Sequence, residues 1–151
     1  MVSRVGRDKQ VYNEHGIRQV CGIIAIDSAA RKIVLVSSRK SDSWILPKGG
    51  WENDESAEES ARREGWEEAG IRGNITRNLG SFLHDKLDAE TGKPVAEFLF
   101  YEMEVVKLEA EWPEGGERRR EWFTFEEALQ RVRYTAMRSA LAACSLAPQP
   151  N

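Results

Sequence analysis

Long apolar runs are missing from this 151-residue sequence. The longest apolar stretches, residues 20–26 and 33–36, are far shorter than the roughly 20 residues that a helix needs to cross a bilayer. Residues 1–8 carry charge, but no apolar segment follows them as it would in a secretory signal peptide. We therefore expect no membrane association and a location in the cytoplasm, the nucleus or both.

Cysteine is scarce as well, and neither sign of charge dominates. Cys21 and Cys144 are too few for a disulfide framework or a zinc site, so we expect both to be reduced and buried. The 22 Lys and Arg residues face 25 Asp and Glu residues, which leaves a net charge of −3. This balance argues against bulk nucleic-acid binding, although residues 118–120 form a local run of three arginines.

The remaining composition is that of a folded domain. Hydrophobic residues make up 40% and charged residues 31% of the chain, a balance that supports a packed core and argues against extensive disorder. The length is close to the commonest size of a single domain. We predict one domain over residues 1–151, with its core at about residues 17–144, a short loose tail from Leu146 onward, and a monomeric state.

The predicted strands and helices follow one another without regular alternation. Runs of β-branched residues predict a hairpin of two buried strands, and Pro47 with the two glycines after Lys48 predicts that a third strand ends in a loop. Strands are predicted at residues 20–26, 32–38, 44–46, 73–83, 96–106 and 121–124, and helices at 57–69, 125–133 and 136–145. This order favours an α+β fold, a mixed sheet with helices on its faces, over a doubly wound one.

The helix at residues 57–69 has recognisable start and stop signals. Ser56 and Glu59 have the spacing of a capping box, and Gly70 follows as the residue that ends the helix. Within the helix, Glu64, Glu67 and Glu68 are spaced i, i+3 and i+4, which places their carboxylates on one face.

Three like charges on one helix face repel one another and call for a compensating cation. Carboxylates are hard oxygen ligands that suit Mg²⁺, or Mn²⁺ in its place, and Mg²⁺ in proteins commonly binds substrate phosphates as well. Taken alone, the acidic face can equally be an ordinary solvated helix surface.

The wider spacing favours the metal site. Seven residues stand at characteristic distances from one another along the chain: Gly49, Glu55, Arg63, Glu64, Glu67, Glu68 and Gly70. This pattern, a loop after a strand followed by a capped helix, resembles the signature of the Nudix hydrolases. One departure is Gly65, where that signature has a bulky aliphatic residue. A glycine inside a helix costs up to about 1 kcal/mol relative to alanine but allows close packing on a sheet.

The resemblance implies an α/β/α sandwich and Mg²⁺-dependent hydrolysis of a phosphoanhydride that is linked to another group. It implies that Glu64 and Glu68, together with Glu67, bind the metal, and that Glu67 is the general base, although Nudix enzymes differ in which carboxylate accepts the proton. Arg63 orients these carboxylates and counts with Glu64 and Glu67 among the catalytic residues. Glu55 and Gly70 are implied to be structural members of the motif.

The resemblance extends beyond this motif to the diphosphoinositol polyphosphate phosphohydrolases, particularly the fungal type. It is carried by residues 6–12, 37–39, 44–50 and 120–122. That subfamily cleaves inositol pyrophosphates and the diadenosine polyphosphates Ap5A and Ap6A, and some members cleave inorganic polyphosphate. By similarity, the expected contacts to such a small polyphosphorylated substrate are Arg18, Ser37, Ser38, Arg39, Lys48, Gly49, Gly50 and Arg120.

Several residues in or near the matching segments also have simpler interpretations. The two glycines can form an ordinary turn, and Arg118 can lie in a solvated loop. His84 either faces the substrate or lies in a solvent-facing loop, and Trp44 and Trp122 belong more often to the core than to a stacking platform. Two other functions stay open: a Nudix hydrolase that prefers a dinucleoside polyphosphate or an RNA cap, and a Nudix-fold sensor that binds a phosphorylated ligand without cleaving it.

Overall fold

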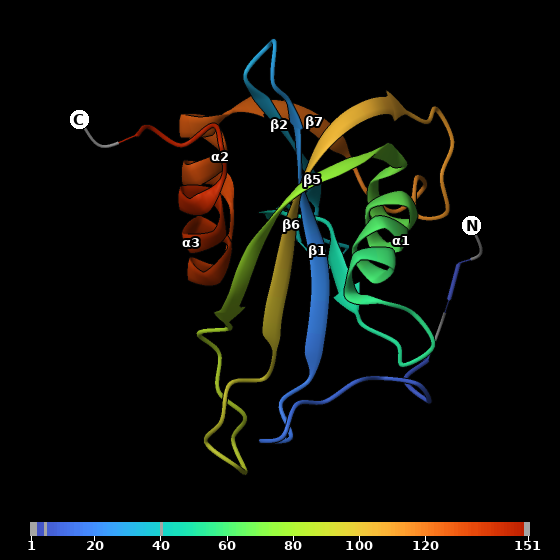
Figure 1. Cartoon of the computed structure of the whole chain (residues 1–151), viewed down its shortest axis with the longest axis vertical. Helices are drawn as coiled ribbons and strands as arrows, with labels where there is room; N and C mark the ends of the chain where they lie inside the picture. Colours follow the sequence, from blue (N-terminus) through green and yellow to red (C-terminus); the bar gives the residue numbers. More distant parts are fainter. Residues whose placement is uncertain (1–2, 5, 40, 150–151) are drawn as a thin grey trace.

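The computed structural model describes residues 3–4, 6–39 and 41–149. A central sheet has helix α1 (Ala57–Ala69) on one face and helices α2 (Phe125–Arg131) and α3 (Thr135–Ala143) on the other (Figure 1). Strands β1 and β6 of this sheet are parallel, whereas β5 and β6 are antiparallel. The predicted α+β class, with a mixed sheet between helices, is confirmed.

Seven strands from the described residues form the sheet, and buried β1 lies at its centre. The order is β3-β2-β1-β6-β5, with β4 paired to β1 and β7 paired to β2. The strands are β1 (Gln19–Asp27), β2 (Lys32–Ser37), β3 (Trp44–Ile45), β4 (Lys48–Gly50), β5 (Ile71–Leu83), β6 (Glu97–Leu108) and β7 (Arg120–Thr124). The apolar side chains of β1 and β2 that the sequence placed in the core are buried there.

The β1–β2 hairpin is present, but its strands separate after two residue pairs. Beyond Ile26↔Ile33 and Asp27↔Lys32, β1 pairs with β6 and with β4 instead. The prediction of a loop at residues 48–50 is wrong, because these residues form β4 opposite residues 20–22 of β1. Glycine at position 49 lets the short strand lie directly against α1, where a side chain would overlap the carboxyl group of Glu64.

Helix α1 is bounded as the sequence predicts. Ser56 and Glu59 form the reciprocal capping box, and Gly70 ends the helix with a left-handed backbone at φ 64°. Gly65 faces β1 so closely that a Cβ atom there would overlap the side chain of Ile23. The glycine that departs from the motif therefore allows the helix to pack closely on the sheet.

The predicted loose C-terminal tail starts later than expected. Leu146 and Ala147 are buried in the core, and the backbone N–H of Ser145 donates to buried Glu102 on β6 at 2.7 Å. Two buried apolar side chains and a part-buried hydrogen bond thus hold this segment in place, and residues 150–151 lie outside the described part. No helix in the described part of the chain is long and apolar enough to span a bilayer.

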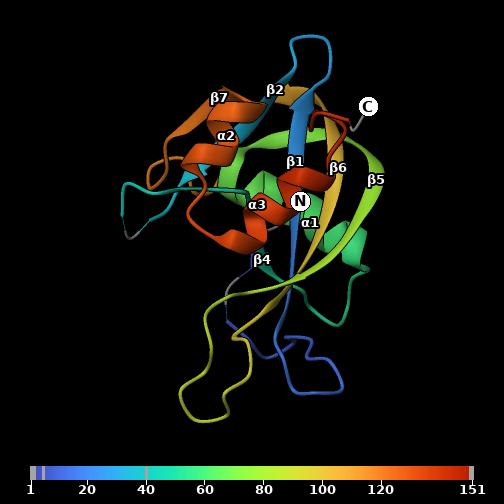
Figure 2. The same ribbon diagram turned by 90° about the vertical axis from the view of Figure 1, so that its left-hand side faces the viewer.

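Two loops extend past the same end of the sheet and lie beside each other there (Figures 1 and 2). One precedes β1 and the other, residues 84–96, joins β5 to β6. The N–H of Glu97 donates to the carbonyl of Arg18, and Lys93 Nζ donates to the carbonyl of His15. These contacts fix the loops as walls at the end of the sheet where α1 presents its acidic face.

Candidate active site

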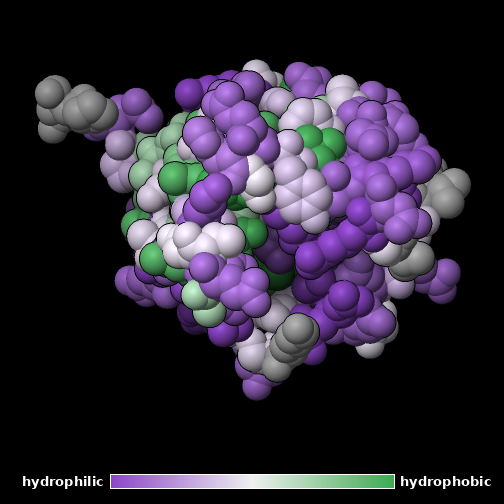
Figure 3. All heavy atoms as spheres, turned by 90° about the horizontal axis from the view of Figure 1, so that it is seen from below, coloured by the Kyte–Doolittle hydropathy of each residue, from purple (hydrophilic) through white to green (hydrophobic). Residues whose placement is uncertain are grey.

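A cavity of about 1150 Å³ opens between α1, β4 and the two end loops. Seen from that end, the molecular surface is hollowed near its centre, and hydrophilic residues gather along one side of the hollow (Figure 3). The side chains from α1 that line it are Arg63, Glu64, Glu67 and Glu68. The four charged residues that the sequence assigned to catalysis or to metal binding therefore share one cavity.

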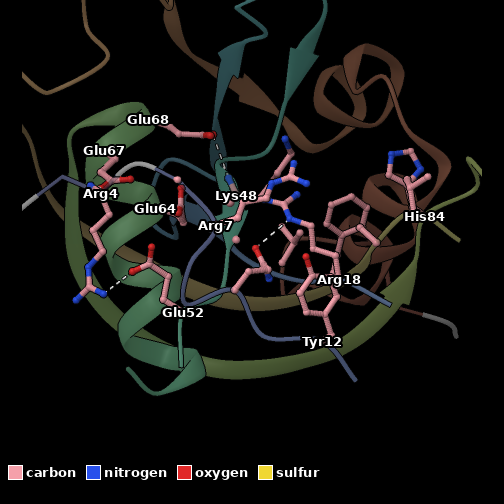
Figure 4. A pocket seen from close by; sticks show the side chains of 18 of the residues that line it. Arg4, Arg7, Tyr12, Arg18, Lys48, Glu52, Glu64, Glu67, Glu68 and His84 are labelled. Atoms are coloured by element: carbon pink, nitrogen blue, oxygen red, sulfur yellow. Dashed lines mark hydrogen bonds and ion pairs between the residues drawn. The ribbon is translucent and has the colours of Figure 1, made fainter. Parts of the chain in front are cut away.

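The three glutamates are buried although they line the cavity. Glu64, Glu67 and Glu68 are exposed by only 6%, 3% and 6%, and all three project from one side of α1 (Figure 4). A buried carboxylate must be compensated by hydrogen bonds or by cations. The partners of each carboxylate therefore determine what the site can do.

Arg63 holds three carboxylates together. Its Nη1 donates to Glu64 at 2.9 Å and to Glu67 at 3.2 Å, and its Nε donates to Glu55 at 3.0 Å. A further bond from Nη2 to the carbonyl of Gly50 ties the helix to β4. Glu55 also accepts from the backbone N–H of Glu52 at 3.3 Å, so it braces the preceding loop against the helix, in keeping with its predicted structural role.

Glu68 is held from two other elements. Its Oε1 accepts the backbone N–H of Lys48 on β4 at 3.1 Å, and its Oε2 accepts Nη2 of Arg118 at 3.2 Å. The Arg118 side chain is only 6% exposed and also donates to Glu114 and to the carbonyl of Ser37. Arg118 is thus not the solvated loop residue that the simpler interpretation suggested.

Glu67 accepts a bond from the N-terminal segment. The backbone N–H of Arg4 donates to its Oε1 at 2.7 Å, while the Arg4 side chain pairs with Glu52 and Asp54 on the loop before α1. The sequence analysis did not identify Arg4 as a site residue. A backbone donor 63 positions away leaves no pattern in the sequence that would reveal it.

Burial makes the negative charge of this cluster unfavourable. It raises the pKa of Glu64 to about 8, with the nearby charge of Glu68 adding to the effect, and it raises the pKa of Glu68 to about 7 against the opposing charge of Lys48. Burial also raises the pKa of Glu67, but for Glu55 the hydrogen bonds and charge of Arg63 outweigh burial and lower it. The three cavity glutamates are therefore a site that a further cation would stabilise.

The chemistry of these donors fits a divalent cation. Among residues 3–4, 6–39 and 41–149, no three acidic, His or Cys side chains are already arranged to hold a metal ion; Arg63 binds Glu64 and Glu67, and Arg118 binds Glu68. Buried carboxylates on one face of a helix are nonetheless the hard oxygen ligands that Mg²⁺ and Mn²⁺ prefer. Glu64 and Glu68, with Glu67, are the residues that would hold such an ion.

The rest of the cavity wall includes several cations. Arg18 lies on the side opposite α1, Lys48 lies between them, and His84 lies farther along the same wall (Figure 4). Of the residues predicted to contact substrate, the cavity brings together Arg18, Arg39, Lys48, Gly49 and Gly50. Ser37 and Ser38 do not line it but border an adjoining hollow of about 540 Å³, which shares Arg39 and Arg118 with the main cavity.

Arg120, which the sequence predicted as a substrate contact, does not line either hollow within the described residues. Its guanidinium lies over the ring of Trp112 at 4.1 Å, and its Nη1 donates to the carbonyls of Ala69 and Glu109 at 2.8 Å each. The positive charge of Arg120 therefore lies at the C-terminal end of α1 and binds its last carbonyl. The cavity arginine of this run is Arg118, two positions earlier.

Some cavity residues were not singled out from the sequence. They include the cations Arg7, Lys86 and Lys93 and the aromatic Tyr12, all from the two end loops. Only residues 6–12 had a signal, as part of the wider resemblance, because the 84–96 loop was the segment that matched least.

The aromatic residues follow the simpler interpretation in part. Trp44 is buried and packs edge-on against Phe123, so it belongs to the core, and both cysteines are buried and free. His84 does line the cavity, where its ring lies between Phe98 and Tyr134 at 5.3 and 4.6 Å.

The charge imbalance predicts that the metal-free protein is stabilised when Glu64 is neutralised. The pKa of Glu64 is raised on folding, so the free energy of unfolding falls progressively as the pH rises from about 4.5 to about 8. In chelator at pH 8, Glu64→Gln should be roughly 2 kcal/mol more stable than the parent, and the difference should disappear near pH 4. Mg²⁺ should raise the melting temperature of the parent more than that of the variant. A variant that is less stable at pH 8 would contradict this account of the cluster.

Comparison with known proteins points to one family. A family model described as "NUDIX domain" matches residues 16–144. The chain is 40% identical over 150 residues to "Nudix hydrolase 18, mitochondrial" of Arabidopsis thaliana, covering 93% of this chain and 83% of that protein. It is 32% identical over 125 residues to "Diphosphoinositol polyphosphate phosphohydrolase 3-alpha" of Homo sapiens, covering 80% and 73%. A NUDIX hydrolase structure from Nitrosomonas europaea shares the fold with a TM-score of 0.70, at 17% identity over 84% of this chain and 87% of that one.

Proposed function

Because the chain belongs to the Nudix hydrolase family, we propose that its pyrophosphohydrolase activity is directed at inositol pyrophosphates and diadenosine polyphosphates, and extends to inorganic polyphosphate. The observation that carries this substrate class is the division of the cavity. Buried carboxylates of α1 occupy one side, and cations from the two end loops, from β4 and from the segment after β2 line other parts of the wall. Such a wall suits a compact ligand with many phosphates, because arginine and lysine bind phosphate oxygens directly.

The residues have distinct roles in this proposal. Glu64 and Glu68, with Glu67, would hold Mg²⁺, which when bound lowers the pKa of water and offsets charge on the phosphoryl oxygens. A carboxylate oxygen of Glu67 accepts the proton of the attacking water, and Arg63 keeps that carboxylate in place. Arg18, Arg39 and Lys48 bind the phosphates that are not cleaved, and β4 gives its glycine backbone room to approach them.

Phosphate release from a diphosphoinositol pentakisphosphate and from Ap6A, assayed in parallel with Mg²⁺, tests this proposal. Loss of the β-phosphate from the inositol substrate, abolished by a chelator, would support it. Turnover of Ap6A alone would favour the nucleotide hydrolase, for which a cavity of this size also has room. Tight binding of both compounds without turnover would favour a sensor.

Arg18 offers a test of substrate recognition that does not involve the carboxylates. Arg18→Ala removes a cavity cation, so we expect KM for the inositol substrate to rise about tenfold with little change in kcat. The control is Arg77→Ala, which removes an exposed arginine from β5 that does not line the cavity. Equal effects of the two substitutions would mean that Arg18 acts only through the overall charge.

The assembly and location of the protein are predictions of the same kind. We propose a monomer, which a measurement of the molar mass in solution would test. A cytoplasmic or nuclear location stays a prediction, and the name of the 40% identical plant relative places that protein in mitochondria.

A further inference from the structure

Three carbonyls in the last turn of α1 are bonded to the loop between β6 and β7 and to the first residue of β7. The final four carbonyls of a helix lack partners within it. Here the carbonyl of Trp66 accepts the N–H of Gly70, and the next three are taken by residues from outside the helix. Their donors are the N–H of Glu114 to Glu67 O at 3.1 Å, Trp112 Nε1 to Glu68 O at 2.9 Å, and Arg120 Nη1 to Ala69 O at 2.8 Å.

The first residue of this loop, Glu109, is bonded both to the end of the helix and to Arg120 at the start of β7. The N–H of Glu109 donates to the carbonyl of Gly70 at 2.8 Å, and Arg120 Nη1 donates back to the carbonyl of Glu109. The guanidinium of Arg120 lies over the indole of Trp112 at 4.1 Å. We call Glu109, Trp112, Glu114 and Arg120 the helix clamp.

The clamped carbonyls belong to the residues whose side chains line the cavity. Trp112 binds the backbone of Glu68, and Glu114 binds the backbone of Glu67. Between these two anchors and β7, the loop also carries Arg118, whose guanidinium binds the carboxylate of Glu68. One segment therefore fixes both the backbone and a side chain of the carboxylate cluster.

We propose that Trp112, supported by Arg120, is a positioning residue for the hydrolysis: it holds the last turn of α1 so that Glu67 and Glu68 face the cavity correctly. This inference rests on the proposed function for its activity test alone. Trp112 does not line the cavity in the described residues, so it acts through the helix. Small displacements of catalytic groups can lower rates about 100-fold, which makes such a clamp important for the chemistry.

The test is Trp112→Phe, which removes the indole N–H but keeps an aromatic ring under Arg120. We expect kcat to fall about 5- to 20-fold, KM for substrate to change less than twofold, and the Mg²⁺ concentration for half-maximal activity to rise. Hydrogen exchange of the amides at residues 66–70 should become faster, and Mn²⁺ binding, followed by electron paramagnetic resonance, should weaken.

The matched control is Trp122→Phe, the same exchange at a half-buried indole on β7, for which the described contacts include no bond to α1. It should leave kcat, Mn²⁺ affinity and exchange at residues 66–70 unchanged. If Trp112→Phe does not fold, Arg120→Lys serves as the second variant, because lysine keeps the charge but lacks the planar group that stacks on the ring and binds two carbonyls.

The outcomes separate the clamp from the substrate assignment. A fall in kcat with faster exchange in the last turn supports the clamp. Unchanged kcat per folded molecule, or a rise in KM alone, overturns it, even if the variant melts earlier. If the parent cleaves none of the proposed substrates, the substrate proposal fails, while Mn²⁺ binding and hydrogen exchange still decide whether Trp112 positions the helix.

Discussion

Glu67→Gln should lower kcat at least about 100-fold on any substrate that the protein cleaves, with KM changed much less. Gln has nearly the same shape, and its one side-chain oxygen can keep either the bond from the N–H of Arg4 or that from Arg63, which reach different oxygens of Glu67. The amide cannot take a proton from water, and removal of a general base commonly costs 10²- to 10⁴-fold. Steady-state rates at saturating Mg²⁺ provide the measurement.

Glu58→Gln is the control for that experiment. It makes the same chemical change in the first turn of the same helix, at an exposed residue that does not line the cavity. Its kcat should equal that of the parent. If Glu67→Gln retained more than about a tenth of the parent kcat, Glu67 would not be the base, and Glu64 or Glu68 would be the next carboxylate to examine.

The parts of the site that the sequence predicted are those with local causes. The capping box, the i, i+3, i+4 spacing and the glycine after the helix all act within one or two turns, so α1 and the face of its glutamates follow from the sequence alone. Gly65 belongs to the same class, since a missing side chain at a sheet-facing position indicates close packing.

The parts that it did not predict depend on distant pairing. The contact of Arg118 with Glu68 joins residues 50 positions apart, and nothing local distinguishes Arg118 from Arg120 as the arginine that faces the cavity. The sequence predicts a loop at the short strand β4 because proline and glycine weaken strand propensity. Its place beside β1 is instead set by backbone pairing and by the carboxyl group of Glu64, which occupies the space above Gly49.

Gly49→Ala should abolish most activity while the protein stays folded. A Cβ atom at this position would overlap the carboxyl carbon and both oxygens of Glu64. The backbone of Gly49 cannot easily move away, because it lies opposite Cys21 in the pairing of β4 with β1. The Glu64 side chain must therefore shift, and displacement of a metal-binding carboxylate by about 1 Å predicts roughly a 100-fold loss of kcat/KM. Activity and thermal melting, measured on the same preparation, provide the test.

Gly65→Ala should have the opposite effect, a change in stability and not in activity, because its methyl group would meet only the Ile23 side chain in the core. That variant should change the melting temperature and leave kcat per folded molecule within about threefold of the parent. A double-mutant cycle then isolates the cause of the Gly49→Ala defect. Asp at position 64 is one methylene shorter and leaves room for the new methyl group, so Gly49→Ala should cost far less activity in a Glu64→Asp background than in the parent. Losses that simply multiply would show that the glycine acts through the backbone of β4 and not through Glu64.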